Sequence, residues 1–188
     1  MVAIIGISAA IAAPAMMESM AVRRSSEASH TLVRIGARAR TEAVAYGRAY
    51  VLRFAETSGG GGSYGSVELW RGRVDRCSAN PWSTIISGTC ASARDDCLES
   101  LDMGRYAYPT YKVQMRMTGA TAGSLCFQPN GDMFFTTNVT AAPTVWRTTP
   151  PSGTGGIRFT LDRLNGATVT GVQRVVVFPF GAGPRLLR

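Results

Sequence analysis

The chain has 188 residues, which suits one globular domain with an appendage rather than several domains. Its hydrophobic content is ordinary, so the chain can form a real core. The formal net charge is +8, almost all of it from arginine because Lys112 is the only lysine. This charge favours anionic partners such as nucleic acid or lipid head groups, although a plain solvated surface explains it more often.

Four cysteines point to an oxidising compartment. They are Cys77, Cys90, Cys97 and Cys126, with no Cys-x-x-Cys spacing, and His30 is the only histidine. Zinc requires four soft ligands in a compact cluster, so we predict no metal site. An exported domain with one or two disulfides fits better, and three pairings are open. Buried free thiols in a cytosolic protein are the alternative.

The opening segment, residues 1–17, carries no charge. A membrane-spanning helix needs about 20 apolar residues, and this segment is slightly shorter and contains Ser8 and Pro14. It fits three hypotheses: a signal peptide without the usual basic leading region, a buried core helix, or the remaining part of a membrane anchor whose first turns are absent.

The next segment is amphipathic. Its charged side includes Arg23 and Glu27, and Arg38 and Glu42, which are spaced four apart and are expected to pair. The apolar positions follow one face of a helix. They are Ala28, Leu32, Ile35, Ala39, Ala43, Tyr46 and Tyr50.

No turn signal except Pro14 separates the two segments, and Gly36 weakens a helix without ending it. We therefore predict one long helix over residues 1–47. Its hydrophobic first half would lie in lipid or among other helices, and its second half against a globular head.

The residues of this helix resemble a known family. The stretch AIIGISAAIAAP, residues 3–14, closely resembles the hydrophobic N-terminal helix of type IV pilins and type II secretion pseudopilins, with Gly6 and Pro14 at matching positions. Residues 32–54 resemble the second half of that helix in the GspH/FimT subfamily, where an Ala-Arg-x-Glu-Ala segment precedes a Gly and the first strand. The matching residues are Ala39, Arg40, Glu42, Ala43 and Gly47.

The resemblance implies an inner-membrane, single-pass protein with its head in the periplasm, whose helix later forms a filament core. Its partners would be membrane lipid before assembly and other pilins or pseudopilins afterwards. The residues expected to anchor and assemble the subunit are Ile4, Ile5, Gly6, Ile7, Ile11, Pro14 and Met17. The family's basic leader and early glutamate are missing. We expect a start codon assigned too late or a truncated chain, beginning about eight residues into the mature helix, rather than an unprocessed protein.

After Gly47 the apolar period changes from 3.6 to 2, which indicates strands. We predict strands at 50–55, 67–74, 111–119, 157–162 and 173–180, the last of them central, and a hairpin over 125–137. The glycine-rich stretch 58–66 lacks the Gly-Lys-Ser/Thr ending of a P-loop and is predicted to be a hairpin loop.

The segment 76–104 is predicted to be irregular and stapled by a cysteine pair, with Cys126 within reach of an earlier cysteine. The fold class is therefore α+β, with the long helix packed on an antiparallel β-sandwich. Residues 1–47 would form the anchor and assembly helix, and residues 48–188 a head of roughly seven strands in two packed sheets.

No catalytic constellation is present. His30 sits on the helix without an acidic or thiol partner, and the Gly-x-Ser-x-Gly motif is absent. Asp95 and Asp96 lack the alternating ligands of a calcium loop and are assigned to a solvated loop. We predict neither an enzyme nor a cofactor or small-molecule substrate.

The favoured function is structural: a minor pilin or pseudopilin, with a slight preference for a type IV pilus over a type II secretion system. DNA binding for uptake is a less favoured alternative. The resembling DNA-binding pilins carry a C-terminal Gly-Arg-x-Arg motif, and this chain ends Gly-Pro-Arg-Leu-Leu-Arg, leaving Arg174, Arg185 and Arg188 as candidate phosphate contacts. An exported non-pilin β domain, cleaved around residues 13–16, is the other alternative.

Overall fold

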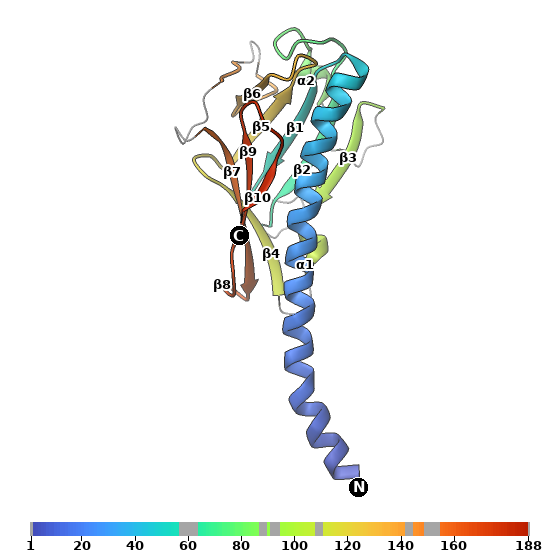
Figure 1. The fold of residues 1–188 in the computed structure, drawn as a ribbon, viewed down its shortest axis with the longest axis vertical. Coiled ribbons are helices and arrows are strands. Elements are labelled where there is room, and N and C mark those ends of the chain that lie inside the picture. Colours follow the sequence, from blue (N-terminus) through green and yellow to red (C-terminus); the bar gives the residue numbers. More distant parts are fainter. Residues whose placement is uncertain are drawn as a thin grey trace.

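The computed structural model describes residues 2–56, 64–86, 90, 95–107, 111–141, 145–148 and 155–187, and side chains from Met16 onward. One long helix, α1 (Val2–Tyr46), precedes an antiparallel β head (Figure 1). The other elements are β1 (Tyr50–Ala55), β2 (Ser66–Arg71), α2 (Trp82–Ile85), β3 (Cys97–Asp102), the 3-10 helix η2 (Met103–Tyr106), β4 (Tyr111–Met117), β5 (Ala122–Phe127), β6 (Met133–Thr136), β7 (Gly156–Asn165), β8 (Thr168–Val169), β9 (Arg174–Pro179) and β10 (Arg185–Leu187).

The strands form two sheets, so the α+β class is confirmed. One sheet has the order β3-β2-β1-β5-β6, and the other has the order β10-β9-β7-β4 with β8 paired to β7. All the strand pairs are antiparallel, and each of the predicted strands overlaps a strand of the structure. β9 lies between β10 and β7, so it is an interior strand of its sheet.

Besides the two-residue β8, two strands were not predicted. β3 lies within the segment predicted to be irregular, and it pairs with β2 through a register shift between Leu69 and Trp70. β10 comes from the tail, where it pairs with β9. Both are edge strands whose apolar alternation is too short to distinguish from a loop. Neighbouring strands, rather than the local sequence, therefore determine these two elements.

The predicted apolar face of α1 is the face that enters the core. Ala28, Leu32, Ile35, Ala39 and Ala43 are each at most 1% exposed. Tyr46 does not belong to this face, because its side chain is 68% exposed where the helix ends. Gly47 follows with φ of +63°, the left-handed conformation that commonly terminates helices.

The sheet that contains β1 is covered on both faces. Leu52, Leu69 and Leu125 occupy paired positions and point into the core shared with α1 and the second sheet. Residues of opposite parity, such as Val51 and Cys126, point to a smaller core closed by the segment around α2. The predicted loop 76–104 thus contributes a second hydrophobic cluster to the head.

Asn80 organises the loop between β2 and α2. Its Oδ1 accepts hydrogen bonds from the backbone N–H groups of Arg73 (2.6 Å) and Val74 (3.1 Å). Its Nδ2 donates to the carbonyls of Val74 (3.1 Å) and Arg76 (2.7 Å). The Asn80 side chain is buried, and the four hydrogen bonds that it makes are partly buried.

We expect Asn80→Ala to lower the free energy of unfolding by about 2–3 kcal/mol, because several partly buried polar groups lose their partner together. Urea denaturation measures this change. Asn165→Ala is the matched control, since Asn165 is exposed at the end of β7. Equal losses in the two variants would contradict this bracing role.

Candidate assembly helix and basal surface

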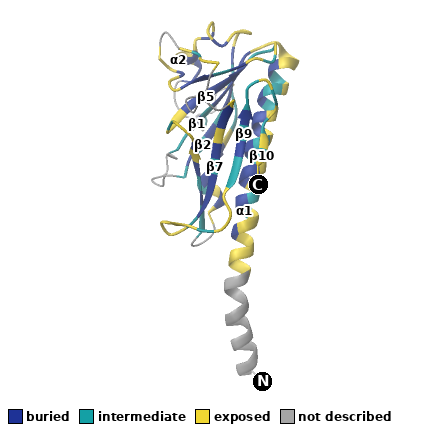
Figure 2. Ribbon diagram, turned by 60° about the vertical axis from the view of Figure 1, so that its left-hand side comes forward, coloured by how far each residue is buried: buried dark blue, intermediate teal, exposed yellow. Residues whose placement is uncertain are grey.

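The helix α1 has two structurally different parts. From Ala21 onward, one of its faces is buried against the strands of both sheets. Before that point the helix continues past the head, and Met16–Met20 are exposed (Figures 1 and 2). We call the end of the head from which α1 projects the base.

Ion pairs hold one flank of α1 on the edge strand β3. Arg34 and Arg38 both pair with Glu99, the latter at 3.0 Å. Arg38 also forms the predicted pair with Glu42 at 2.6 Å, and the hydrogen bond with Glu42, together with Glu99, raises the pKa of the Arg38 guanidinium. This network keeps the helix in register with the sheet that contains β3.

The other flank of α1 is clamped at the base by Arg163 of β7. This largely buried guanidinium donates to the carbonyl of Glu18 (3.4 Å) and to its carboxylate (3.3 Å). It also lies over the ring of Tyr111, 5.4 Å from its centroid. Glu18 is the first charged residue of the chain, so Arg163 binds α1 at the point where the charge-free segment ends.

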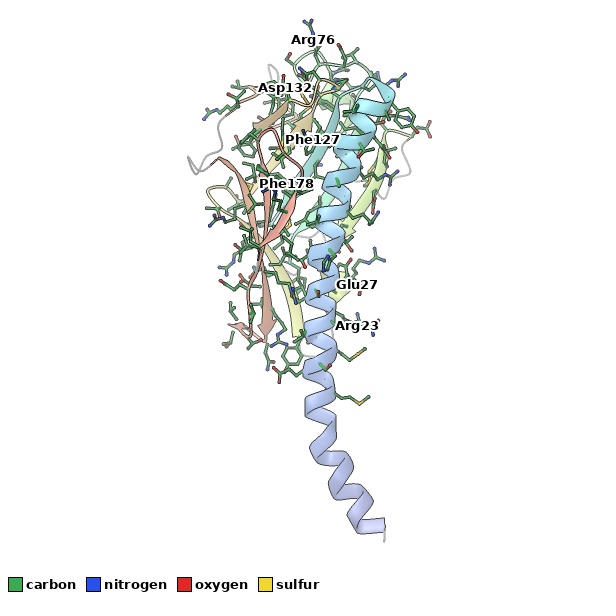
Figure 3. The ribbon with its side chains drawn as sticks, viewed as in Figure 1. Arg23, Glu27, Arg76, Phe127, Asp132 and Phe178 are labelled. Atoms are coloured by element: carbon green, nitrogen blue, oxygen red, sulfur yellow. A yellow bond between two sulfur atoms is a disulfide. The ribbon has the colours of Figure 1, made fainter. Side chains whose placement is uncertain are left out.

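A polar cleft of about 460 Å³ opens between α1 and the β3–η2 segment. Arg24 crosses it, with its guanidinium donating to the carbonyls of Arg105 (3.5 Å) and Ala107 (3.3 Å). Arg23 and Glu27 lie on the same flank near the base (Figure 3) and, although both are described, form no ion pair with each other. The predicted Arg23–Glu27 pair is therefore wrong, because the two side chains line an open cleft.

The arginines considered for DNA binding are not brought together. Arg185 is paired opposite Val177, whereas Arg174 is paired opposite Leu161. Because side chains alternate, Arg174 shares the core-facing side of β9 with Val176, and Arg185 lies on the opposite side of the sheet. Arg174 lines a cavity beside Glu18 and Arg163. Arg188 lies outside the described residues.

All four cysteines are in disulfides. Cys77 is joined to Cys126, which fastens the segment before α2 to β5. Cys90 is joined to Cys97 at the start of β3. The structure thus selects one of the three pairings, and it joins Cys126 to an earlier cysteine, as expected.

The side chains of Ile4, Ile5, Ile7, Ile11 and Pro14 lie outside the described part, and so does any side-chain environment of Gly6, whereas Met17 is exposed. Among the helices that are described, none combines the length and apolarity that crossing a membrane requires. Within the described residues, no cluster of His, Cys, Asp or Glu could hold a metal ion.

Sequence reasoning missed Arg105, Arg163 and Glu99. Arg105 follows β3 in η2, and Arg163 belongs to β7, where it follows the buried Asp162. The local sequence around such a charge carries no signal for the distant helix that it contacts. Only the docking of α1 identifies these residues.

Comparisons with protein-family models, with curated protein sequences and with solved structures find no match to this chain.

Proposed function

We propose that this chain is a minor pilin or pseudopilin of the GspH/FimT type, which assembles through α1 into a type IV pilus or a type II secretion pseudopilus. One observation carries the proposal: a single 45-residue helix is half packed into an antiparallel β head and half projected beyond it. We also propose that the two sheets of the head form a β-sandwich and that the first half of α1 is its hydrophobic half.

The projecting part of α1 would be unfavourably exposed to water, and assembly into a filament would bury it. Residues 1–17 contain no charge, and at 1.5 Å per residue they extend about 25 Å. Water is a poor environment for such a helix, whereas lipid or the apolar surfaces of like helices bury it. Lipid would hold the segment before assembly, and neighbouring subunits would hold it in the filament.

The head would work in an oxidising compartment, the periplasm. Two disulfides link its segments, and such bonds form and persist outside the cytosol. This localisation fits the membrane-inserted helix at the inner membrane. Pilus biogenesis genes or secretion-system genes beside the gene for this chain would distinguish a pilus from a pseudopilus.

We expect Ile7→Asp together with Ile11→Asp to remove the subunit from filaments. A carboxylate in the middle of an apolar helix costs about 2.5–3.5 kcal/mol for each residue in a membrane setting. The measurement compares membrane and sheared-filament fractions of the organism that encodes the chain. Val44→Asp is the control, because Val44 lies on the same helix but is exposed on the head.

If the double variant reached filaments as the wild type does, α1 would not be the assembly element. That outcome would favour the alternative of an exported β domain outside any filament. The DNA-binding alternative is weakened by the opposite orientations of Arg174 and Arg185 on their sheet, although basic residues elsewhere on the head still permit phosphate contacts.

A further inference from the structure

The base of the head presents exposed apolar side chains around the exit of α1. They come from the helix and from the β8 region, which lies at the same end of the molecule (Figure 1). The members are Met17, Met20, Val22, Val169 and Val172. Val172 is 82% exposed and lines a cavity together with Val22 and Glu18, which places the two elements side by side. Exposed apolar side chains that lie together on a surface often mark a contact with a partner or a membrane.

Cations lie beside Met20 of this apolar set, on the flank of α1 that faces η2. The cleft between α1 and η2 is lined by four arginines and two glutamates: Arg23, Arg24, Arg34, Arg105, Glu27 and Glu99. Glu99 is already neutralised by its pairs with Arg34 and Arg38. The remaining charge of the cleft is therefore positive.

Two of these arginines are available to a ligand. Among the residues that the structure describes, Arg23 and Arg105 are exposed and their guanidinium groups have no carboxylate within ion-pair distance. Arg24 fixes the wall between them by donating to two backbone carbonyls of the η2 segment. The cleft thus presents guanidinium groups without carboxylate partners, beside a wall that Arg24 holds in place. Such groups can donate hydrogen bonds to phosphate oxygens.

The distance along α1 between the apolar side chains and the arginines matches the distance between the hydrocarbon layer and the phosphate layer of a bilayer. Arg23 follows Met17 by six residues, which is about 9 Å along a helix. The head-group region of one leaflet is about 5–8 Å thick, and helical side chains lean toward the N-terminus. Long arginine side chains also extend their charge toward the interface. With residues 1–17 in lipid, Arg23 and Arg105 would therefore face the phosphate layer.

We infer that the base of the head seats on the membrane surface and that the cleft between α1 and η2 binds the phosphate groups of anionic phospholipids. The inference rests on the proposed insertion of α1 in lipid. It adds a second contact, which orients the head before the subunit leaves the membrane. The apolar set enters the interface, and the arginines hold the head groups.

The test uses the purified full chain in a vesicle flotation assay. One set of vesicles is pure phosphatidylcholine, and the other contains equal parts of phosphatidylcholine and phosphatidylglycerol. We expect both to bind, with tighter binding to the anionic set that weakens as salt rises. Arg23→Gln with Arg105→Gln should lower binding to the anionic vesicles about tenfold and leave binding to the neutral vesicles unchanged.

The matched control is Arg48→Gln with Arg76→Gln, which removes the same charge. Arg48 follows the far end of α1, and Arg76 lies at the end of the head opposite the base (Figure 3). Thermal melting checks that both double variants fold. An equal loss in the control, or no loss in the Arg23/Arg105 variant, would overturn the cleft as the binding site.

Three further outcomes are distinguishable. If the wild type bound neither kind of vesicle, the lipid insertion of α1 would fail, and the proposed function with it. If neutral vesicles bound but anionic ones gave no gain, only the head-group site would fail. Added inorganic phosphate that abolished the anionic preference at constant ionic strength would reassign the cleft to a free anion.

Discussion

Replacing Cys77 and Cys126 together by alanine is expected to lower the free energy of unfolding by about 4 kcal/mol. The disulfide closes a loop of 49 residues, and the entropy that it removes from the unfolded chain grows with the length of that loop. Both cysteines are also buried, in the small core that contains Trp82 and Ile85. Without the bond, the segment before α2 loses its covalent link to β5.

The second disulfide provides the control for this prediction. Cys90 and Cys97 close a loop of only seven residues, for which the same relation gives about 2 kcal/mol. Denaturant unfolding of Cys77→Ala/Cys126→Ala and Cys90→Ala/Cys97→Ala, with the m-value of each variant fitted separately, measures both changes. A larger loss for the Cys90/Cys97 variant would contradict the assignment of Cys77–Cys126 as the main staple of the head.

A second large effect is expected at Gly36, in the middle of the packed half of α1. A Cβ atom built at this position would lie 2.7 Å from Cζ of Phe178 on β9, and the ring is buried. We expect Gly36→Leu to lower the free energy of unfolding by about 3 kcal/mol, because the side chain overpacks the contact between helix and sheet. The gain in helix propensity, about 1 kcal/mol, offsets only part of this loss.

Ala37→Leu is the matched control, since the neighbouring Ala37 is exposed and leucine has a helix propensity close to that of alanine. Thermal and urea unfolding should leave that variant close to the wild type. Combining Gly36→Leu with Phe178→Ala tests the contact directly. The double variant should be more stable than the sum of the two single losses, by about 1–3 kcal/mol. Strict additivity would show that the leucine is accommodated elsewhere.

Local periodicity was enough to predict the main elements. The spacing of Ala28, Leu32 and Ile35 follows the helical period, and it correctly placed one face of α1 in the core. Runs such as residues 111–117 alternate with period two and form strands. Both signals depend only on near neighbours in the chain, because burying one side of an element forces its apolar residues into that element's own period.

The positions of Gly36 and Arg23 show what local periodicity does not contain. From the sequence, Gly36 was predicted only to weaken the helix. In the structure, the absence of a side chain at Gly36 leaves room for the ring of Phe178, which comes from a strand more than one hundred residues away. Arg23 was expected to pair within its own helix, and it instead lines a cleft opposite Arg105. Each outcome depends on which distant element docks beside α1.

The sequence alone therefore determined the long helix, its apolar face, most of the strands and the charge-free segment that supports the assembly proposal. Tertiary structure alone decided the pairing of the cysteines, the edge strands β3 and β10, and the separation of Arg174 from Arg185. The physical reason is the range of the interactions. Backbone hydrogen bonding and apolar period act between near neighbours, whereas disulfides, edge pairing and ion clusters require residues that only the complete fold brings together.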